Sequence, residues 1–342
     1  MSNQTPLTSE EISSTVDSFE PIDIEEMELN LPIFNELDSC QNLLIAGMGG
    51  GFDVFCGLPL YFELKKHGIN AHLANFSFSD IENVDFGIRL TKTLVGIRAK
   101  PEKVFPYFPE FHLVNWFKEK RNEEVTVWCF HKTGAVPLTE NYKVLSEHLG
   151  IDGILLVDGG VDSLVRGDEA ELGTAIEDLT SLYAVNQLSN VPTRLIACIG
   201  FGAEQNLTYA HIFENIASLT KSGGFLGLCS LTPQMDSYQA YDEAVTYVQS
   251  NEFQDPSVIN SSIVSATRGN YGDYHLTEKT KRSHLWISPL MPIYWFFDFD
   301  CVVKQNMLLA EIKDTMLFRE TLYKVIAKAE RISRRPASKI PL

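Results

Sequence analysis

The sequence predicts an α/β fold in which a mostly parallel sheet is covered by helices on both faces. Short apolar runs of strand length alternate with segments of helical periodicity along most of the chain. This alternation is typical of parallel sheets, whose strands are buried on both sides. Four glycines within residues 47–51 follow the first apolar run, where the chain would turn from a buried strand into a helix.

Apolar runs predict the strands, and segments with helical periodicity predict the helices between them. Strands are expected at residues 42–46, 72–78, 125–130, 153–157, 194–199 and 225–229. Helices are expected at residues 53–67, 138–149, 176–188, 207–221 and 236–250. Residues 305–332 place their apolar side chains at helical spacing and predict a long C-terminal helix.

The remaining segments predict the domain organisation. Residues 1–38 are expected to be an acidic, partly disordered N-terminal arm, residues 39–332 a single α/β domain, and residues 333–342 a basic tail. Inside the domain, the polar residues 251–284 predict a long loop or lid. Residues 100–117 combine three prolines with many aromatic side chains. They favour a helix docked on the core, with a pocket cover or a subunit contact as the alternatives.

The charge pattern excludes a general nucleic-acid or anionic-membrane binder. The chain has 45 Asp and Glu against 28 Lys and Arg, which gives a net charge of −17. Ten of the acids, and no Lys or Arg, lie in residues 1–38, so the rest of the chain is only mildly acidic. The arm and the aromatic residues 104–117 are both candidate contacts in a homo-oligomer.

Cysteine usage and hydropathy favour a cytoplasmic protein. The six cysteines are scattered without a C-x-x-C pair, which predicts free thiols in a reducing compartment rather than disulfides or a metal site. No signal peptide is recognisable at the N-terminus. No apolar run approaches the roughly 20 residues that are needed to cross a bilayer.

The first candidate ligand site is the glycine-rich turn formed by Gly47, Gly49, Gly50 and Gly51. Ligands of open parallel sheets bind beyond the carboxyl ends of the strands. Glycine amides at a helix start can hold a phosphate or a carboxylate there. Phe52 stands at the third glycine of the dinucleotide fingerprint, so NAD in its standard pose is weakly supported. Asp53 either caps the helix or contacts the ligand.

The second candidate site is the acidic segment after the fourth strand, which contains Asp158, Gly159, Gly160, Asp162, Arg166, Asp168 and Glu169. Acids this close raise one another's pKa unless a cation compensates. Such a set suits Mg²⁺ coordination, general acid–base chemistry or binding of a ribose diol. Arg166 could instead bind a substrate phosphate. The alternative is a solvated acidic loop in which Arg166 is the counter-ion. Thr174 and Glu177 beyond it resemble a helix capping box.

A third set of residues follows the fifth strand. Gly200 and Gly202 would open the backbone near the same edge of the sheet, and Glu204 could supply a base. The sequence has no G-x-S-x-G, no H-E-x-x-H and no Cys/His zinc spacing. A covalent Ser or Cys mechanism therefore has no support in the sequence.

Three motifs together carry a family resemblance. They are Gly49-Gly50-Gly51-Phe52-Asp53, then 158–169 with Gly173-Thr174 and Glu177-Asp178, and finally Ile199-Gly200-Phe201-Gly202 with Gly223-Gly224-Phe225. On these motifs the chain resembles, over roughly residues 40–330, the domain of unknown function 1152 family of archaea and bacteria. The resemblance implies a Rossmann-like α/β fold. It implies no activity, so it sharpens the place of the site more than its chemistry.

The leading hypothesis is an enzyme that hydrolyses or transfers a group of a small phosphorylated or nucleotide-like metabolite. The glycine turn would hold the anionic group, with Mg²⁺ or a nucleotide as the candidate cofactor. Asp158, Asp162 and Asp168 would orient a hydroxyl, a water or the metal, and Arg166 would neutralise negative charge. Two alternatives stay open: a non-catalytic nucleotide-binding or regulatory protein, and an NAD(P)-dependent oxidoreductase with a non-standard glycine loop.

Overall fold

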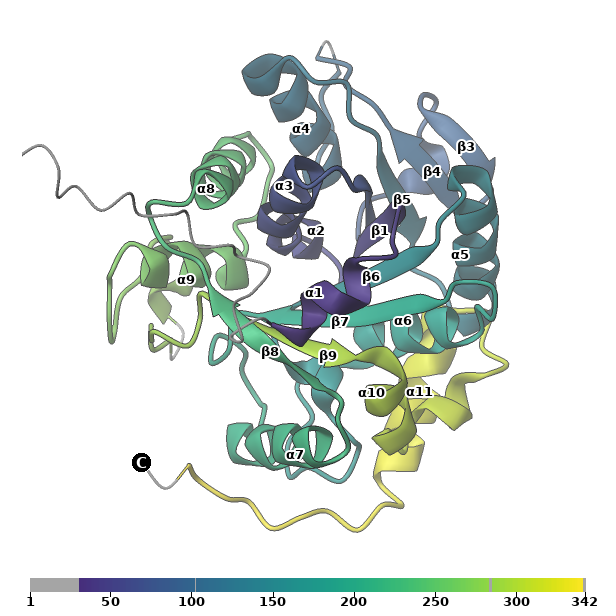
Figure 1. The fold of residues 1–342 in the computed structure, drawn as a ribbon, viewed down its shortest axis with the longest axis vertical. Helices are drawn as coiled ribbons and strands as arrows, with labels where there is room; N and C mark the ends of the chain where they lie inside the picture. The colour runs from purple at the N-terminus through teal and green to yellow at the C-terminus, as the bar shows by residue number, and fades with distance from the viewer. Residues whose placement is uncertain (1–30, 102, 283–284, 341–342) are drawn as a thin grey trace, which may run out of the picture. The chain divides into compact units, whose positions relative to one another are not determined.

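The computed structural model describes residues 31–101, 103–282 and 285–340. Most of the predicted acidic arm, up to residue 30, lies outside them. Within the described residues, nine strands form one sheet in the order β3-β4-β5-β2-β1-β6-β7-β9-β8 (Figure 1). No helix among these residues has the length and apolar character that crossing a membrane requires.

The centre of the sheet has the Rossmann strand order. Five parallel strands lie side by side as β5-β2-β1-β6-β7. Their bounds are β1 (Asn42–Gly47), β2 (Asn70–Ser77), β5 (Val127–His131), β6 (Gly153–Gly159) and β7 (Thr193–Ile199). The chain adds strands on one side of β1 and then on the other, so the topological switch point lies between β1 and β6. The predicted α/β fold class is confirmed.

All six predicted strands form, and three further strands were not predicted. The sixth predicted strand is β8 (Phe225–Ser230). The unpredicted β3 (Ile88–Thr91) and β4 (Leu94–Ile97) extend the sheet from β5 as an antiparallel hairpin. Each has only four residues, too few for a periodic signal. The unpredicted β9 (Ile293–Asp298) lies antiparallel between β7 and β8.

Helices cover both faces of the sheet (Figure 1). One layer contains α2 (Asp53–Cys56), α3 (Leu58–Lys66), α4 (Pro109–Trp116), α8 (Asp236–Gln249) and α9 (Val258–Thr267). The other contains α5 (Ala135–Leu149), α6 (Ile176–Asn186), α7 (Tyr209–Lys221), α10 (Phe299–Gln305) and α11 (Phe318–Ala329). A short helix α1 (Pro32–Leu37) precedes β1. Short helical turns are η2 (Ile81–Asn83), η3 (Phe117–Arg121), η4 (Asp162–Leu164), η5 (Thr280–Arg282) and η6 (Leu309–Ile312).

Three helix predictions need correction. The predicted helix 53–67 is two helices, because the chain breaks at Gly57 and α3 restarts with Pro59 in its first turn. The predicted loop 251–284 contains α9, which Ser257 caps by accepting the N–H of Asn260. The predicted long helix 305–332 is divided into η6 and α11. Its second part begins where Glu320 Oε2 accepts the N–H groups of residues 316 and 317.

Two other expectations are confirmed in the described residues. The aromatic segment 100–117 contains the docked helix α4, whose Phe111, Leu113, Val114 and Trp116 are fully buried. All six cysteines are free thiols.

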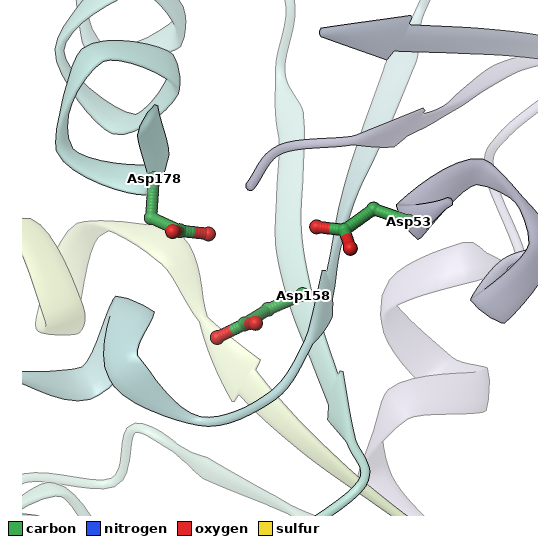
Figure 2. A group of neighbouring side chains, drawn as sticks. All are labelled: Asp53, Asp158 and Asp178. Carbon is green, nitrogen blue, oxygen red and sulfur yellow. The ribbon is translucent and has the colours of Figure 1, made fainter. Parts of the chain in front are cut away.

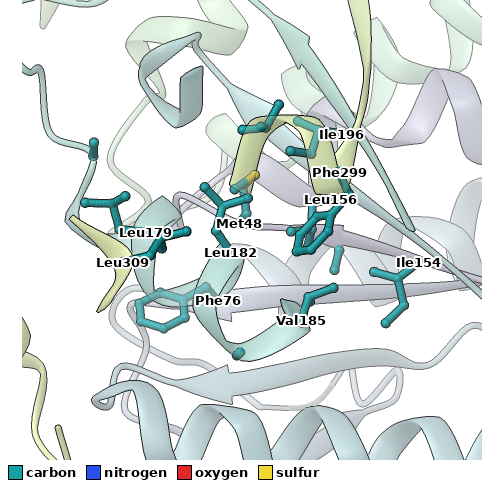
Figure 3. Close-up of a cluster of buried hydrophobic side chains, with 14 of the residues drawn as sticks. Met48, Phe76, Ile154, Leu156, Leu179, Leu182, Val185, Ile196, Phe299 and Leu309 are labelled. Carbon is teal, nitrogen blue, oxygen red and sulfur yellow. The ribbon is translucent and has the colours of Figure 1, made fainter. Parts of the chain in front are cut away.

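The apolar core on one side of the sheet fixes the position of α6, the helix that carries Asp178. Leu179, Leu182 and Val185 recur at helical spacing on α6 and pack with Leu156 of β6 and Ile196 of β7 (Figure 3). Each fully buried aliphatic side chain contributes roughly 1.5–3 kcal/mol. The start of α6 is therefore held firmly against the carboxyl edge of the sheet.

Candidate functional site

Acidic side chains from three separate elements meet at the topological switch point. Asp53 begins α2 just after β1, Asp158 lies at the end of β6, and Asp178 lies in the first turn of α6. One carboxylate oxygen from each lies within 4.8 Å of the others, and the three side chains point toward one another (Figure 2). We call Asp53, Asp158 and Asp178 the carboxylate triad.

The glycine turn brings the carboxylate of Asp53 back to the backbone of Gly49. Gly50 and Gly51 have φ angles of 95° and 60°, which side chains with a Cβ rarely adopt. The turn lets Gly49 N–H donate to Asp53 Oδ2 at 2.8 Å. Phe52 is the N-cap residue of α2, and no side chain caps this helix. Asp53 is thus not a helix cap, and its carboxylate faces the triad.

Two buried polar side chains, Asn75 and Glu110, form hydrogen bonds that hold the glycine turn in place. Asn75 of β2 donates through Nδ2 to the Gly51 carbonyl at 2.8 Å and to Glu110 Oε1 at 2.7 Å. Its Oδ1 accepts the N–H of Val54 at 3.2 Å. Asn75 and Glu110 are fully buried. Sequence reasoning missed both, although a polar residue inside the apolar run of β2 was a usable signal.

Backbone and hydroxyl hydrogen bonds hold Asp158 of the triad and its acidic neighbours Asp162 and Glu204 in place. Asp158 Oδ2 accepts the N–H of Ser163 at 3.0 Å. Asp162 Oδ2 accepts the N–H and the hydroxyl of Thr174 at 2.8 and 3.1 Å. Glu204, which follows β7, accepts the N–H of Val161 at 2.6 Å through Oε2. The structure therefore brings together Asp53, Asp158, Asp162 and Glu204, as the sequence predicted, and adds Asp178.

The middle of the acidic segment belongs to a different network. Glu169 is fully buried and accepts the N–H groups of Arg166 and Gly167, both at 2.8 Å. Arg335 Nη2 lies 2.9 Å from Glu169 Oε1 and 2.9 Å from Asp168 Oδ1. Asp168 and Glu169 do not join the other acids as predicted, because they engage the C-terminal tail. Arg166 donates its backbone N–H to Glu169, and its buried Nε has no hydrogen-bond partner.

The predicted capping box of Thr174 and Glu177 is also wrong. The N-cap residue of α6 is Ala175, and no side chain caps this helix. Thr174 instead donates to Asp162, and Glu177 Oε1 pairs with Lys132 Nζ at 2.7 Å. Lys132 was not predicted, and Glu177 was assigned to the cap. No site role was predicted for Asp178, although Glu177-Asp178 belongs to the second motif of the family resemblance and was a usable signal.

Burial and mutual repulsion raise the pKa of the acids of this site. Desolvation raises the pKa of Asp53 to about 7, although the backbone amides of Gly49 and Gly159 oppose the rise. Desolvation, followed by the charge of Asp162, raises the pKa of Asp158, Asp178 and Glu204 well above the ordinary range. The pKa of Asp162 is raised by desolvation as well.

The acids of the site have no basic partner among the described residues, and one carboxylate oxygen is unsatisfied. Among the described residues, no Lys or Arg forms an ion pair with the triad, Asp162 or Glu204. Asp178 is only 3% exposed, and its Oδ1 has no hydrogen-bond partner. An unsatisfied buried polar atom costs roughly 1–3 kcal/mol. Carboxylate oxygens in such a set are the ligands that Mg²⁺ and Ca²⁺ prefer.

The glycines lie against the protein's own side chains. A Cβ on Gly49 would lie 2.7 Å from Asp53 Oδ2 and 3.0 Å from Asp178 Oδ1. A Cβ on Gly50 would overlap the ring of Phe78. Gly160 lies in the same way against the Glu204 carboxylate, Gly159 against Asp53 and Gly200 against Ile259. A bare anion on this turn would meet carboxylates, so the geometry favours a cation beside the turn.

The family comparison covers most of this site. The family model described as "Protein of unknown function (DUF1152)" matches residues 106–329, which are 224 of the 342 residues. This chain belongs to that family. The resemblance read from the motifs is thereby confirmed, over a shorter span than roughly residues 40–330. No curated protein and no solved structure matches the chain.

The residues matched by the DUF1152 family model include one part of the site and leave out the other. Asp158, Asp162, Asp178 and Glu204 lie within the matched residues. Asp53 and the glycine turn precede them. The fold places both groups at one switch point, so the candidate site of this DUF1152 member joins the matched region to the first βα unit.

Proposed function

We propose that this protein is a divalent-cation-dependent enzyme that hydrolyses or transfers a group of a small phosphorylated or nucleotide-like metabolite. The cation is held by the carboxylate triad. The observation that carries the proposal is the buried Oδ1 of Asp178, which has no partner and lies among acids without a neutralising cation. Mg²⁺ sites in proteins commonly combine one or two carboxylates with waters and substrate phosphates.

The surrounding acids fit the chemistry of such a reaction. A bound divalent cation supplies charge neutralisation for a phosphate and lowers the pKa of a coordinated water. Asp162 and Glu204 lie together beside the triad, and burial raises the pKa of each. A carboxyl group whose pKa is raised toward neutrality can accept a proton from the attacking hydroxyl or water when it is ionised, or donate a proton to the leaving group when it is protonated. Solvent reaches this edge, because Gly49, Gly159 and Glu204 are only half-buried.

The same charges bear on the alternatives. A dinucleotide in the standard pose would bring its pyrophosphate onto the glycine turn, where Asp53 and Asp178 already lie. This arrangement favours cation-dependent chemistry over an NAD(P)-dependent oxidoreductase. A non-catalytic nucleotide-binding or regulatory protein would use the same cation and is distinguished by the absence of turnover.

The Asp178→Asn variant tests the proposal. We expect the wild-type protein to bind Mn²⁺ or Mg²⁺ in isothermal titration calorimetry, and Asp178→Asn to weaken this binding by at least about tenfold. The variant should unfold at the same temperature as the metal-free wild type or higher, because the neutral amide replaces an acid whose ionised form is disfavoured by burial and by the neighbouring acids. Asp300→Asn is the matched control, since Asp300 is 65% exposed and pairs with Arg194. Wild-type protein without affinity for either cation would contradict the proposal.

Turnover is tested separately with the full-length protein. We expect Mg²⁺-dependent release of product from at least one member of a panel of sugar phosphates, nucleotides and phosphoesters. Asp178→Asn should lose that turnover and Asp300→Asn should keep it. Tight binding of a nucleotide with no turnover under any metal condition would favour the regulatory alternative.

A methyl group on Gly49 should disturb the same site by geometry. Gly49→Ala places a Cβ within 3.1 Å of three carboxylate oxygens of Asp53 and Asp178, so these side chains must move. We expect the affinity for Mn²⁺ to fall by at least about tenfold. Gly153→Ala is the matched control: its Cβ also meets close neighbours, at 2.7 Å from Cys40 Sγ, but at the opposite end of β6. Equal metal affinities in the two variants would count against the triad.

A further inference from the structure

Lys132 is a positively charged side chain beside the carboxylate triad. It follows β5 directly and therefore lies at the carboxyl edge of the sheet. Its Nζ lies 2.7 Å from Glu177 Oε1, 4.4 Å from the ring centroid of Phe78 and 4.0 Å from that of Phe318. The carboxylate and the two rings hold the ammonium group in place.

The same contacts connect Lys132 to the triad. Glu177 immediately precedes Asp178, and its charge contributes to the raised pKa of both Asp53 and Asp178. The ring of Phe78 covers Gly50 and lies 3.5 Å from the Cβ position of Gly51, in the turn that leads to Asp53. Lys132 and Phe78 thus lie at the same edge of the sheet as the triad, joined to it through Glu177 and through the glycine turn.

The ammonium group retains capacity for a ligand. A lysine has three N–H donors, and Glu177 is the hydrogen-bond acceptor that Lys132 contacts. The two rings offer no conventional acceptor. The Lys132 side chain is 35% exposed, whereas that of Glu177 is 14% exposed, so the charged end can be reached from solvent. Arg166, which the sequence suggested for anion binding, donates its backbone N–H to Glu169, the acid that pairs with Arg335 of the tail.

We propose that Lys132 binds the phosphate group of the substrate, opposite the cation held by Asp53, Asp158 and Asp178. Phosphate oxygens are then shared between a divalent cation and an ammonium group, an arrangement that neutralises the dianion from two sides. This inference rests on the proposed function and names the substrate group that the site recognises. The acids alone would repel that group, and Lys132 supplies the compensating positive charge.

Inorganic phosphate is the probe that tests this proposal. It is titrated into Mg²⁺-saturated full-length protein in a calorimeter, after the Mg²⁺ affinity of each variant has been measured. We expect Lys132→Gln to weaken phosphate binding by at least about tenfold, which corresponds to about 1.4 kcal/mol. The Mg²⁺ affinity should stay within about threefold of wild type, and Lys132→Arg should retain most of the phosphate binding. Lys118→Gln, which removes a similarly exposed lysine from its ion pair with Glu124, is the control.

A second variant separates ligand binding from a structural role of the ion pair. Glu177→Gln leaves the ammonium group in place without its carboxylate partner, so phosphate should bind at least as tightly as to wild type. Equal losses in Glu177→Gln and Lys132→Gln would overturn the inference. So would wild-type protein that binds Mg²⁺ but not phosphate, or phosphate binding that Lys132→Gln leaves unchanged. Wild-type protein that binds no Mg²⁺ would instead remove the proposed function itself.

Discussion

Arg335→Ala should lower the free energy of unfolding by about 3–5 kcal/mol, because it leaves a buried carboxylate without its cation. Glu169 is fully buried, and Arg335 Nη2 lies 2.9 Å from its Oε1. The same guanidinium contacts Asp168 at 2.9 Å and Glu214 at 2.7 Å. Urea unfolding followed by circular dichroism measures the loss.

Arg331→Ala is the control for this prediction, and a double variant tests whether the buried charge of Glu169 causes the loss of stability. Arg331 is an exposed arginine four residues before Arg335, and its replacement should change stability by no more than about 0.5 kcal/mol. Glu169→Gln combined with Arg335→Ala should recover part of the loss, since the buried charge is then gone. If Arg335→Ala unfolds with the same midpoint as Arg331→Ala, the tail does not anchor the loop in solution.

The tail explains why the acidic segment has two parts. Arg334 Nη1 donates to the Glu169 carbonyl at 2.7 Å, and the backbone N–H of Arg335 donates to the Asp168 carbonyl at 2.7 Å. His211 of α7 joins the tail to the loop by accepting the N–H of Ala170 through Nδ1 and contacting the Pro336 carbonyl through Nε2. The loop between Asp162 and Asp178 is thereby held in place at its middle.

Local patterns predicted most of the fold and the outline of the site. Buried parallel strands are continuous apolar runs, so the strands that surround the switch point could be read directly. The rule that ligands bind after such strands located Asp53, Asp158, Asp162 and Glu204. The position of each of these residues is set by the strand that it follows, and such a strand can be recognised from neighbouring residues in the sequence.

The other site residues depend on partners that are distant in the sequence. Asp168 and Glu169 looked like site residues because Arg335, which neutralises them, lies more than 160 residues further along the chain. Asp178 fits a helical pattern, and only the packing of α6 against the sheet turns its carboxylate toward Asp53. Lys132 follows a strand as the predicted residues do, but a single lysine there gives no motif. The sequence also could not show that carboxylates lie against Gly49, Gly159 and Gly160, because most of those side chains come from other parts of the chain.

The metal-free protein should become less stable as the pH rises from about 4 to about 7. The pKa of Asp53 is 3.8 in its ordinary state and about 7 in the folded protein. Between these values the folded state binds a proton that the unfolded state has released, so the free energy of unfolding falls with increasing pH. The contribution of Asp53 to the free energy of unfolding is fully present below its pKa in the unfolded chain, and it is lost as the pH rises through its pKa in the folded protein. Over this interval the loss from Asp53 is about 4 kcal/mol.

Two comparisons connect this slope to the site. Asp53→Asn should reduce it by the share that Asp53 contributes, because the amide carries no proton to lose, whereas replacing the exposed Asp255 with Asn should leave it unchanged. Saturating Mg²⁺ should also flatten it, since a bound cation stabilises the ionised carboxylates and displaces their protons. Thermal unfolding across this pH range, with and without Mg²⁺, measures both effects. A slope that Mg²⁺ leaves intact in wild-type protein would mean that the protons of the triad are not exchanged for a cation, and the site would then act as a set of neutral acids.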